Sequence, residues 1–167
     1  MKNYQEWYRN IRSKLTSRPI LLFLLRSFNR LMTVTMPLVY LTLLVTTFLK
    51  LGLGQQVGVY LLIPASGFVT LSLFRKKINH PRPYETWDIR PLLDKDSSGQ
   101  SMPSRHVFSA TIISMACFHA WTLIGMILLI CSGLLALVRV LGGVHYPKDV
   151  LVGYACGLMW GLLFFLF

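Results

Sequence analysis

Residues 107–138 form a run of 32 residues without a single Lys, Arg, Asp or Glu. A membrane span needs about 20 mostly apolar residues, so this run is too long for one ordinary span. The sequence His-Ala-Trp-Thr at 119–122 lies near its middle and predicts a turn at the membrane interface. We therefore expect a helical hairpin with arms at 103–120 and 122–142.

Three further uncharged runs are long enough to cross a membrane. Residues 31–49 are ended by Lys50 and a glycine-containing stretch, and residues 57–74 are ended by three basic residues. Gly142 and Gly143 break the second arm of the hairpin. Pro147 suits the first turn of a last helix, with its apolar part at 150–167, because its missing N–H costs nothing there. These runs predict an all-α membrane helical bundle of about five transmembrane helices, formed by a single domain of residues 1–167.

The composition excludes other classes of protein. Hydrophobic residues make up 54% of the chain, more than a soluble domain of this size could bury and far more than disordered chains contain. The formal net charge of +11 would suit nucleic-acid binding, but the uncharged runs do not. The charge fits basic flanks of membrane spans instead. We expect membrane lipids and no nucleic acid as partners, and the sequence indicates no protein partner.

The first 30 residues are basic and aromatic, and we expect them to form an interfacial amphipathic helix. Their apolar stretch, residues 20–25, is far too short to span a bilayer. No short apolar core with a small-residue cleavage site follows, so we do not expect a cleaved signal peptide.

The order of the spans places two connections on one face of the membrane. The polar loop at 75–102 joins the second and third spans, and the turn at 142–147 joins the fourth and fifth. Polar residues at 75–106 and 139–149 can therefore meet. Long loops are often functional, so we expect the loop at 75–102 to belong to an active-site face.

Three polar clusters fall on this face: Arg75-Lys76-Lys77 with Arg82-Pro83, then Pro103-Ser104-Arg105-His106, then Arg139 with His145 and Asp149. Basic residues at span ends usually contact lipid headgroups, which is our interpretation of Lys77, Arg90 and Lys95. Arg139 differs because it interrupts an apolar run, where a charge is rarely found without a partner or a role.

The third cluster suggests an activated histidine. If a helix begins near Tyr146 or Pro147, Asp149 lies in its first turn, close to His145. A carboxylate there can hold one ring nitrogen and leave the other free as a nucleophile or base.

The other clusters suggest an anion site. Ser104 is a candidate helix cap just before His106, and a helix N-terminus offers unpaired N–H groups to an anion. Arg82, Arg139 and either Arg75 or Lys76 would add cations suited to phosphate. Two histidines in such a cradle suggest phosphoryl transfer, in which one attacks phosphorus and the other protonates the leaving oxygen. The sequence offers no carboxylate cluster or Cys/His set for a metal, so we expect a reaction that needs neither metal nor cofactor.

The three clusters resemble the signature blocks of the type 2 phosphatidic acid phosphatase family, which shares its site with vanadium haloperoxidases. The first block of that family reads Lys, six residues, Arg-Pro. Here six residues separate Arg75 from Arg82-Pro83, so Arg replaces Lys, and Lys76 is a register-shifted alternative.

The second and third blocks also match with one change each. Pro-Ser-Gly-His becomes Pro103-Ser104-Arg105-His106, with Arg in place of Gly. The third block reads Ser-Arg, five residues, His, three residues, Asp. Val138 replaces its Ser, and the other three residues match in type and spacing.

The resemblance implies a role for each residue. His145 would be the nucleophile that forms a phosphohistidine, Asp149 would orient it, and His106 would be the general acid and then the base for water. The residues implied in phosphate binding are Arg75, Lys76, Arg82, Ser104, Arg105 and Arg139.

The leading hypothesis is therefore a multi-pass lipid phosphate phosphatase of a plasma membrane, most naturally a bacterial one. Its substrate would be a phosphate monoester or diphosphate, with undecaprenyl diphosphate, phosphatidylglycerophosphate and phosphatidate as candidates. The alternatives are a non-catalytic protein that binds anionic lipid, and a channel or transporter. A channel would carry polar residues along its spans, whereas here they collect at one face. The basic residues favour a cytoplasmic active face, whereas the resemblance to lipid-carrier phosphatases favours an outward one.

Overall fold

The computed structural model describes residues 3–95 and 98–167, and within these residues it contains helices and loops but no strand. In chain order, the elements are α1 (Asn3–Thr16), α2 (Pro19–Leu51), α3 (Gln55–Ile78), α4 (Pro83–Thr86), α5 (Arg105–Ala120), α6 (Thr122–Leu141), α7 (Pro147–Gly161) and the 3₁₀ helix η1 (Leu162–Leu166). The all-α fold class and the hairpin broken at Trp121 are confirmed.

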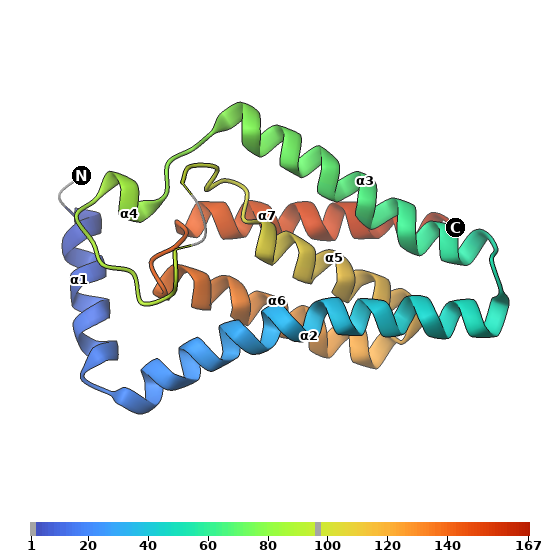
Figure 1. The fold of residues 1–167 in the computed structure, drawn as a ribbon, viewed down its shortest axis with the longest axis horizontal. Coiled ribbons are helices and arrows are strands. Elements are labelled where there is room, and N and C mark those ends of the chain that lie inside the picture. The colour runs from blue at the N-terminus through green and yellow to red at the C-terminus, as the bar shows by residue number, and fades with distance from the viewer. Residues whose placement is uncertain (1–2, 96–97) are drawn as a thin grey trace.

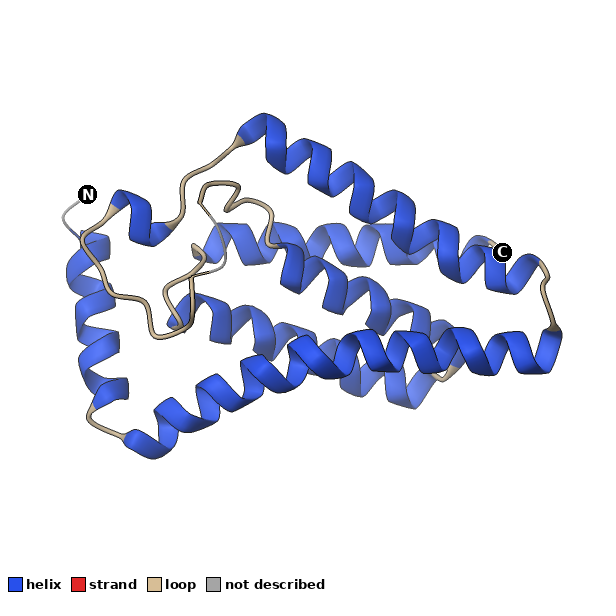
Figure 2. Ribbon diagram, in the orientation of Figure 1, coloured by secondary structure: helices blue, strands red, loops and turns tan. Residues whose placement is uncertain are grey.

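Helices α2, α3, α6 and α7 run alongside α5, which lies in the middle of them (Figures 1 and 2). Between Val107 and Cys117, every residue of α5 except Ser109 is buried. A helix that is apolar all round can be stable only inside other structure. The composition of 107–117 therefore explains why α2, α3, α6 and α7 surround this helix.

Within residues 3–95 and 98–167, four helical segments are long and apolar enough to cross a membrane: Pro19–Leu51, Gln55–Thr86, Thr122–Leu141 and Pro147–Leu166. The expected fifth, α5, has only 16 residues. It is shorter than an ordinary span because the polar loop precedes Arg105 and the chain turns at Trp121. Large apolar side chains such as Leu62 and Leu123 are about 70% exposed on the outside of the bundle. That surface suits a bilayer, and the chain is a multi-pass integral membrane protein.

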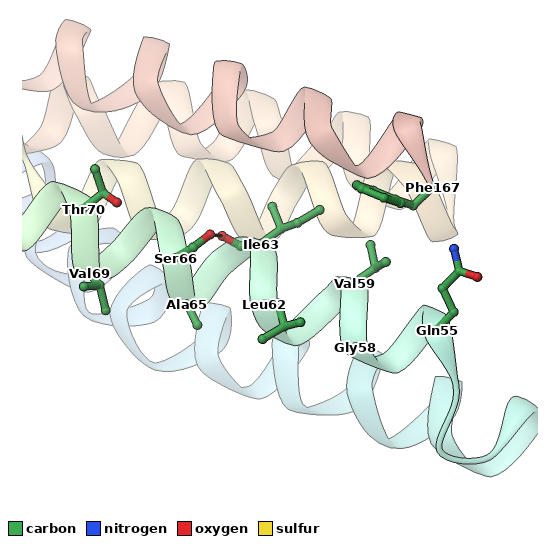
Figure 3. Close-up of a pocket in the computed structure, with 10 residues that line it drawn as sticks. All are labelled: Gln55, Gly58, Val59, Leu62, Ile63, Ala65, Ser66, Val69, Thr70 and Phe167. Carbon is green, nitrogen blue, oxygen red and sulfur yellow. Dashed lines mark hydrogen bonds between the residues drawn. The ribbon is translucent and has the colours of Figure 1, made fainter.

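One such outer surface is a groove of about 880 Å³ along α3 (Figure 3). It is lined mainly by small and apolar side chains, including Val59, Leu62, Val69 and the C-terminal Phe167. Gln55 marks one end of it. This groove lies at the end of the bundle away from the polar clusters, so it faces hydrocarbon rather than the site.

Glycines set the approach of α7 to α5. Gly153, Gly157 and Gly161 are buried at intervals of four residues, one above another on a single face of α7. A Cβ at Gly153 would lie 2.7 Å from the carbonyl oxygen of Ser104, and one at Gly157 would lie 2.7 Å from Cβ of Thr111. Small residues at this spacing let membrane helices pack with their backbones in close contact.

The N-terminal helix is shorter than expected. The expectation of one interfacial helix over 1–30 is wrong in its boundary, because α1 ends at Thr16 and residues 19–30 are the first turns of α2. With 33 residues, α2 is about 50 Å long, which exceeds the roughly 30 Å hydrocarbon core. Helix α1 runs across the end of the bundle instead of along it (Figure 1).

The two connections predicted to share one face do meet. The amide of Leu92, in the loop after α4, donates to the carbonyl of Gly142 at 2.9 Å. The amide of Ser104, just before α5, donates to the carbonyl of Asp149 in α7 at 2.9 Å. Helix α1, the loop with α4 and the turn between α6 and α7 therefore gather at one end of the bundle (Figure 1).

Candidate active site

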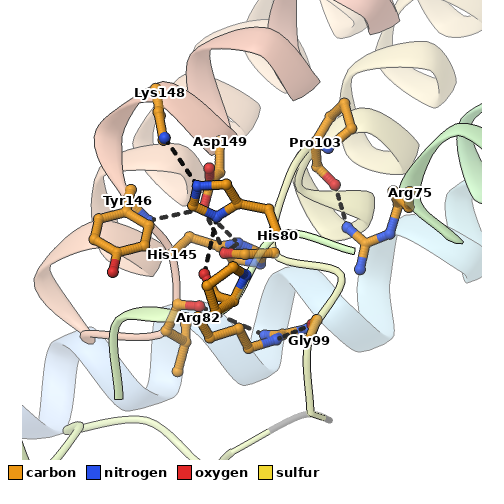
Figure 4. Close-up of polar contacts among 12 residues, drawn as sticks. Arg75, His80, Arg82, Gly99, Pro103, His145, Tyr146, Lys148 and Asp149 are labelled. Atoms are coloured by element: carbon orange, nitrogen blue, oxygen red, sulfur yellow. Dashed lines mark hydrogen bonds and ion pairs between the residues drawn. The ribbon is translucent and has the colours of Figure 1, made fainter. Parts of the chain in front are cut away.

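His145 and Asp149 form a buried pair at the start of α7. Tyr146 is the N-cap and Pro147 occupies the first turn, so Asp149 falls in that turn as expected. Its Oδ2 accepts a hydrogen bond from the backbone N–H of Tyr146 at 3.0 Å and lies 3.6 Å from Nδ1 of His145 (Figure 4). The side chains of His145 and Asp149 are 1% and 0% exposed. Because Nδ1 faces the carboxylate, Nε2 is the ring nitrogen left for chemistry.

Ser101 contacts both His145 and Asp149, and the sequence did not predict it as a site residue. Its hydroxyl donates to Oδ2 of Asp149 and lies 3.4 Å from Nδ1 of His145. Ser101 is fully buried, although it belongs to a loop. Nothing in the local sequence distinguishes it from the other serines of this loop, so only the fold identifies it.

The surroundings of His145 keep its imidazole neutral. Burial lowers the pKa of His145 from 6.5 to about 4. The hydrogen bond with Asp149 opposes this shift, and the positive charges of Arg139 and Arg82 add to it. At neutral pH the ring therefore has an unprotonated nitrogen, as a nucleophile requires.

Three buried arginines come from three different segments. Arg75 near the end of α3 donates to the carbonyl of Pro103, and Arg82 before α4 donates to the carbonyls of Gly99 at 3.2 Å and Val144 at 3.5 Å. Arg139 near the end of α6 donates to Oδ1 of Asn29 in α2 at 3.3 Å. All three arginine residues are at most 2% exposed.

Each of these hydrogen bonds goes to a neutral oxygen. Arg82 and Arg139 both act on the pKa of His145, which places them close to it. Figure 4 shows Arg82 beside His145, with Arg75 on the far side of the loop that carries Pro103. The structure thus brings together the arginines of the first and third clusters.

The structure distinguishes the two alternatives for the first block. Arg75 is buried, whereas Lys76 is exposed on the outside of α3. Neighbouring residues of a helix point about 100° apart, so only one of the two can face the bundle. Lys76 is not brought to the buried cluster.

Ser104 has the expected position but not the expected hydrogen bond. It is the N-cap residue of α5, yet its side chain makes no capping bond to the helix. Its hydroxyl oxygen is buried and has no partner among the residues that the structure describes. A buried hydroxyl is normally hydrogen-bonded, so this one is suited to a bound ligand.

Arg105 and His106 lie in the first turn of α5, beside Ser104. Arg105 is exposed and His106 is half-buried. Both line a groove of about 390 Å³ between α2, α3 and α5. The amide of Ser104 joins this helix start to Asp149, so both histidines belong to neighbouring helix starts.

Two further residues support the site without having been predicted. Asn29 of α2 provides the oxygen that binds Arg139; it stands between Phe28 and Arg30, and nothing in the local sequence marks it. Tyr8 of α1 is fully buried and presses on Gly143, where a Cβ would collide with the tyrosine ring. Gly143 also has φ of 76°, a conformation that favours glycine. Helix α1 thereby covers the turn that carries His145.

His80 links the loop to α7. Its Nδ1 donates to the carbonyl of Pro81 at 2.9 Å, and its Nε2 accepts from Nζ of Lys148 at 3.0 Å. Figure 4 shows this ring close to Lys148 at the start of α7. For residues 3–95 and 98–167, no group of three or more His, Cys, Asp and Glu side chains is placed to hold a metal ion.

Comparisons with known proteins agree with this geometry. No curated protein sequence matches the chain significantly. Among solved structures, LpxE from Aquifex aeolicus superposes with a TM-score of 0.74 at 25% identity, covering 97% of this chain and 94% of that one. A transmembrane PAP2-type phosphatidylglycerophosphate phosphatase from Bacillus subtilis has the same fold, with a TM-score of 0.73 at 21% identity over 98% of this chain and 85% of its own.

The family model of the PAP2 superfamily matches residues 38–167, a range that includes all three clusters. The match covers well over half of the sequence and agrees with the resemblance to type 2 phosphatidic acid phosphatases. The chain therefore belongs to the PAP2 superfamily and is a membrane-embedded phosphoric ester hydrolase, a lipid phosphatase.

Proposed function

We propose that this phosphatase hydrolyses a phosphate monoester or diphosphate of a membrane lipid through a phosphohistidine on His145. The observation that carries the proposal is the buried His145–Asp149 pair beside Arg82 and Arg139. A neutral imidazole with one nitrogen held by a carboxylate is an activated nucleophile. Fixed guanidinium groups stabilise the negative charge of a phosphoryl group in the transition state.

In the first step, Nε2 of His145 attacks phosphorus and the bond from phosphorus to the leaving oxygen breaks. His106 gives its proton to that oxygen, and the lipid product leaves. In the second step, His106 takes a proton from water, the water oxygen attacks the phosphohistidine, and inorganic phosphate is released. Asp149 and Ser101 are positioning residues that hold the ring of His145.

The phosphoryl oxygens would be bound by Arg75, Arg82, Arg139 and the hydroxyl of Ser104. Two observations support these roles. All three arginines are buried, with Arg82 and Arg139 close to His145, and the Ser104 hydroxyl lacks a partner among the described residues. The donors come from the protein alone, so the reaction as proposed uses no metal ion.

The candidate substrates are undecaprenyl diphosphate, phosphatidylglycerophosphate and phosphatidate. Phosphatidylglycerophosphate is the substrate in the name of the relative from Bacillus subtilis. Both solved relatives are bacterial, which supports placing this protein in a bacterial plasma membrane.

The test is phosphate release from a panel of these lipids by the purified protein in detergent. His145→Ala should abolish turnover and the acid-labile phosphate on the protein. His119→Gln is the matched control, because His119 lies within the bundle and its Nδ1 is 2.8 Å from the hydroxyl of Tyr60. Normal turnover by His145→Ala would contradict the proposal.

A second measurement separates the two histidines. His106→Ala should lose about 10²–10⁴-fold on lipid monoesters, whose alkoxide leaves poorly without a proton. With p-nitrophenyl phosphate the leaving group needs no proton, so the variant should give a burst of phenolate followed by slow turnover. Equal impairment on both substrates would contradict the assignment of His106.

A further inference from the structure

Arg105 stands where the second signature block of the family has Gly. It is the first residue of α5, between Ser104, whose hydroxyl has no partner in the described part of the chain, and the half-buried ring of His106. Its side chain is exposed, in contrast to the buried Arg75, Arg82 and Arg139. Arg105 is therefore a cation added outside the buried cluster, next to the proposed general acid.

The groove that Arg105 and His106 line is polar at one end and apolar along its length. Along α5 it extends from Arg105 to Ile113, about 12 Å of helix. Its other walls come mainly from apolar side chains of α2, α3 and α6: Met32, Met36, Pro37, Phe68 and Leu135. A groove with a guanidinium and an imidazole at its polar end fits an amphiphile with an anionic group and one hydrocarbon chain.

The position of this groove decides which part of a substrate it holds. Under the proposed function, on which this inference rests, the transferred phosphoryl group lies at His145 and the leaving oxygen lies at His106. The atoms attached to that oxygen are then next to Arg105, and the hydrocarbon chain follows into the groove. In a lipid monoester the attached atom is carbon, which gains nothing from a guanidinium. In a lipid diphosphate it is a second phosphorus with its own charged oxygens.

We infer that Arg105 makes this site selective for lipid diphosphates, by binding the phosphate that stays on the lipid. The attack of His145 breaks the bond between the terminal phosphorus and the bridging oxygen, and the electron pair of that bond goes to the bridging oxygen. The leaving group is the lipid monophosphate, so negative charge grows on the phosphate beside Arg105. Arginine can contact two of its oxygens at once. Water then releases inorganic phosphate, and the sum is lipid diphosphate plus water giving lipid monophosphate plus phosphate.

The test compares two substrates with the same hydrocarbon chain, farnesyl diphosphate and farnesyl phosphate. The wild-type protein should have the higher kcat/KM for the diphosphate. Arg105→Gln should reduce kcat/KM for the diphosphate on the order of 10²-fold, the usual effect of one transition-state donor. The same variant should lower kcat/KM for the monophosphate by a much smaller factor, and its remaining turnover of the monophosphate shows that it is folded. Arg105→Lys should retain part of the preference.

Lys77→Ala is the matched control. It also removes one exposed positive charge, from the end of α3 that carries Arg75. It should leave the preference unchanged. If Arg105→Gln lowers both activities equally, or if Lys77→Ala has the same effect, Arg105 attracts anionic lipid in general and the inference is wrong. A wild-type preference for the monophosphate would also overturn it, with the phosphatase function intact. If the wild-type protein hydrolyses neither farnesyl substrate and no lipid of the panel, the proposed function itself is wrong.

Discussion

Gly153 is the residue at which packing and catalysis can be tested together. A Cβ there would lie 2.7 Å from the carbonyl oxygen of Ser104 and 3.2 Å from its nitrogen. These are backbone atoms, which cannot rotate away as a side chain can. Gly153→Ala must therefore separate the start of α5 from α7. The 2.9 Å hydrogen bond from Ser104 to the carbonyl of Asp149 crosses the same contact and would lengthen.

The expected size follows from three effects. Alanine in place of glycine inside a helix gains about 0.5–1 kcal/mol. Overpacking a close contact costs about 1–3 kcal/mol, and a lost backbone hydrogen bond costs about 1 kcal/mol. We expect Gly153→Ala to be less stable by about 1–3 kcal/mol. A displacement of about 1 Å between catalytic groups can cost 10²-fold in rate, so we expect a loss of that order in kcat/KM.

Two other glycines provide matched controls. Gly133 on the outside of α6 has no atom within 4 Å of an added Cβ, so Gly133→Ala should be fully active and slightly more stable. Gly157 has the same close contact as Gly153, 2.7 Å from Cβ of Thr111, but about 6 Å farther along α7. Gly157→Ala should lose stability with a much smaller loss of activity.

The assay is a thermal unfolding curve in detergent together with initial rates on one lipid phosphate, for all three variants. The reasoning predicts that stability falls in Gly153→Ala and Gly157→Ala and that activity falls steeply only in Gly153→Ala. Wild-type kcat/KM in Gly153→Ala would refute it. An equal loss of activity in Gly157→Ala would show that bundle stability, and not the spacing of α5 and α7 at the site, controls turnover.

The remaining predictions concern the site itself. Arg139→Lys should lower kcat/KM on the order of 10²-fold, since lysine cannot contact two phosphoryl oxygens from one plane; near-normal turnover would show a merely structural arginine. Ser101→Ala should lower kcat about tenfold or more, because it removes a hydrogen bond to the buried carboxylate worth about 1.5–3 kcal/mol. Ser101→Thr should keep most activity, and the pair is measured side by side. Burial holds the pKa of His145 at about 4, against 6.5 when unfolded, so the unfolded chain takes up the proton first as pH falls. The contribution of neutral His145 to the free energy of unfolding should therefore be fully present above pH 6.5 and fall by roughly 3 kcal/mol as the pH is lowered to 4. The Tm of His145→Gln should not show this fall with pH. Turnover should survive EDTA and be inhibited by vanadate, which mimics five-coordinate phosphorus; a requirement for added divalent metal would contradict the proposed mechanism.

Much of the fold was predictable because it depends on short-range sequence features. The uncharged run at 107–138 with a polar interruption determines a hairpin, and the order of the spans determines which connections share a face. The spacing of His145 and Asp149 around Pro147 determines a pair in one helical turn. Each of these depends on residues that are close in the chain or on simple counting.

The errors at the N-terminus have a physical cause. Residues 18–30 contain three basic residues, Arg18, Arg26 and Arg30, and so they resemble an interfacial segment. In the structure residues 19–30 are the first turns of α2, whose length of about 50 Å exceeds the roughly 30 Å hydrocarbon core. Composition alone does not distinguish a separate interfacial helix from the protruding end of a long span.

What the sequence by itself determined is the set of helices, the face on which the polar clusters gather, and the pairing of His145 with Asp149. Only the tertiary structure decided that Arg75 faces the bundle and Lys76 does not, because that depends on the rotation of α3 against its neighbours. It also brought in Ser101 and Asn29 and turned the Ser104 hydroxyl away from helix capping. These choices depend on contacts between segments far apart in the chain, and no local pattern of residues encodes them.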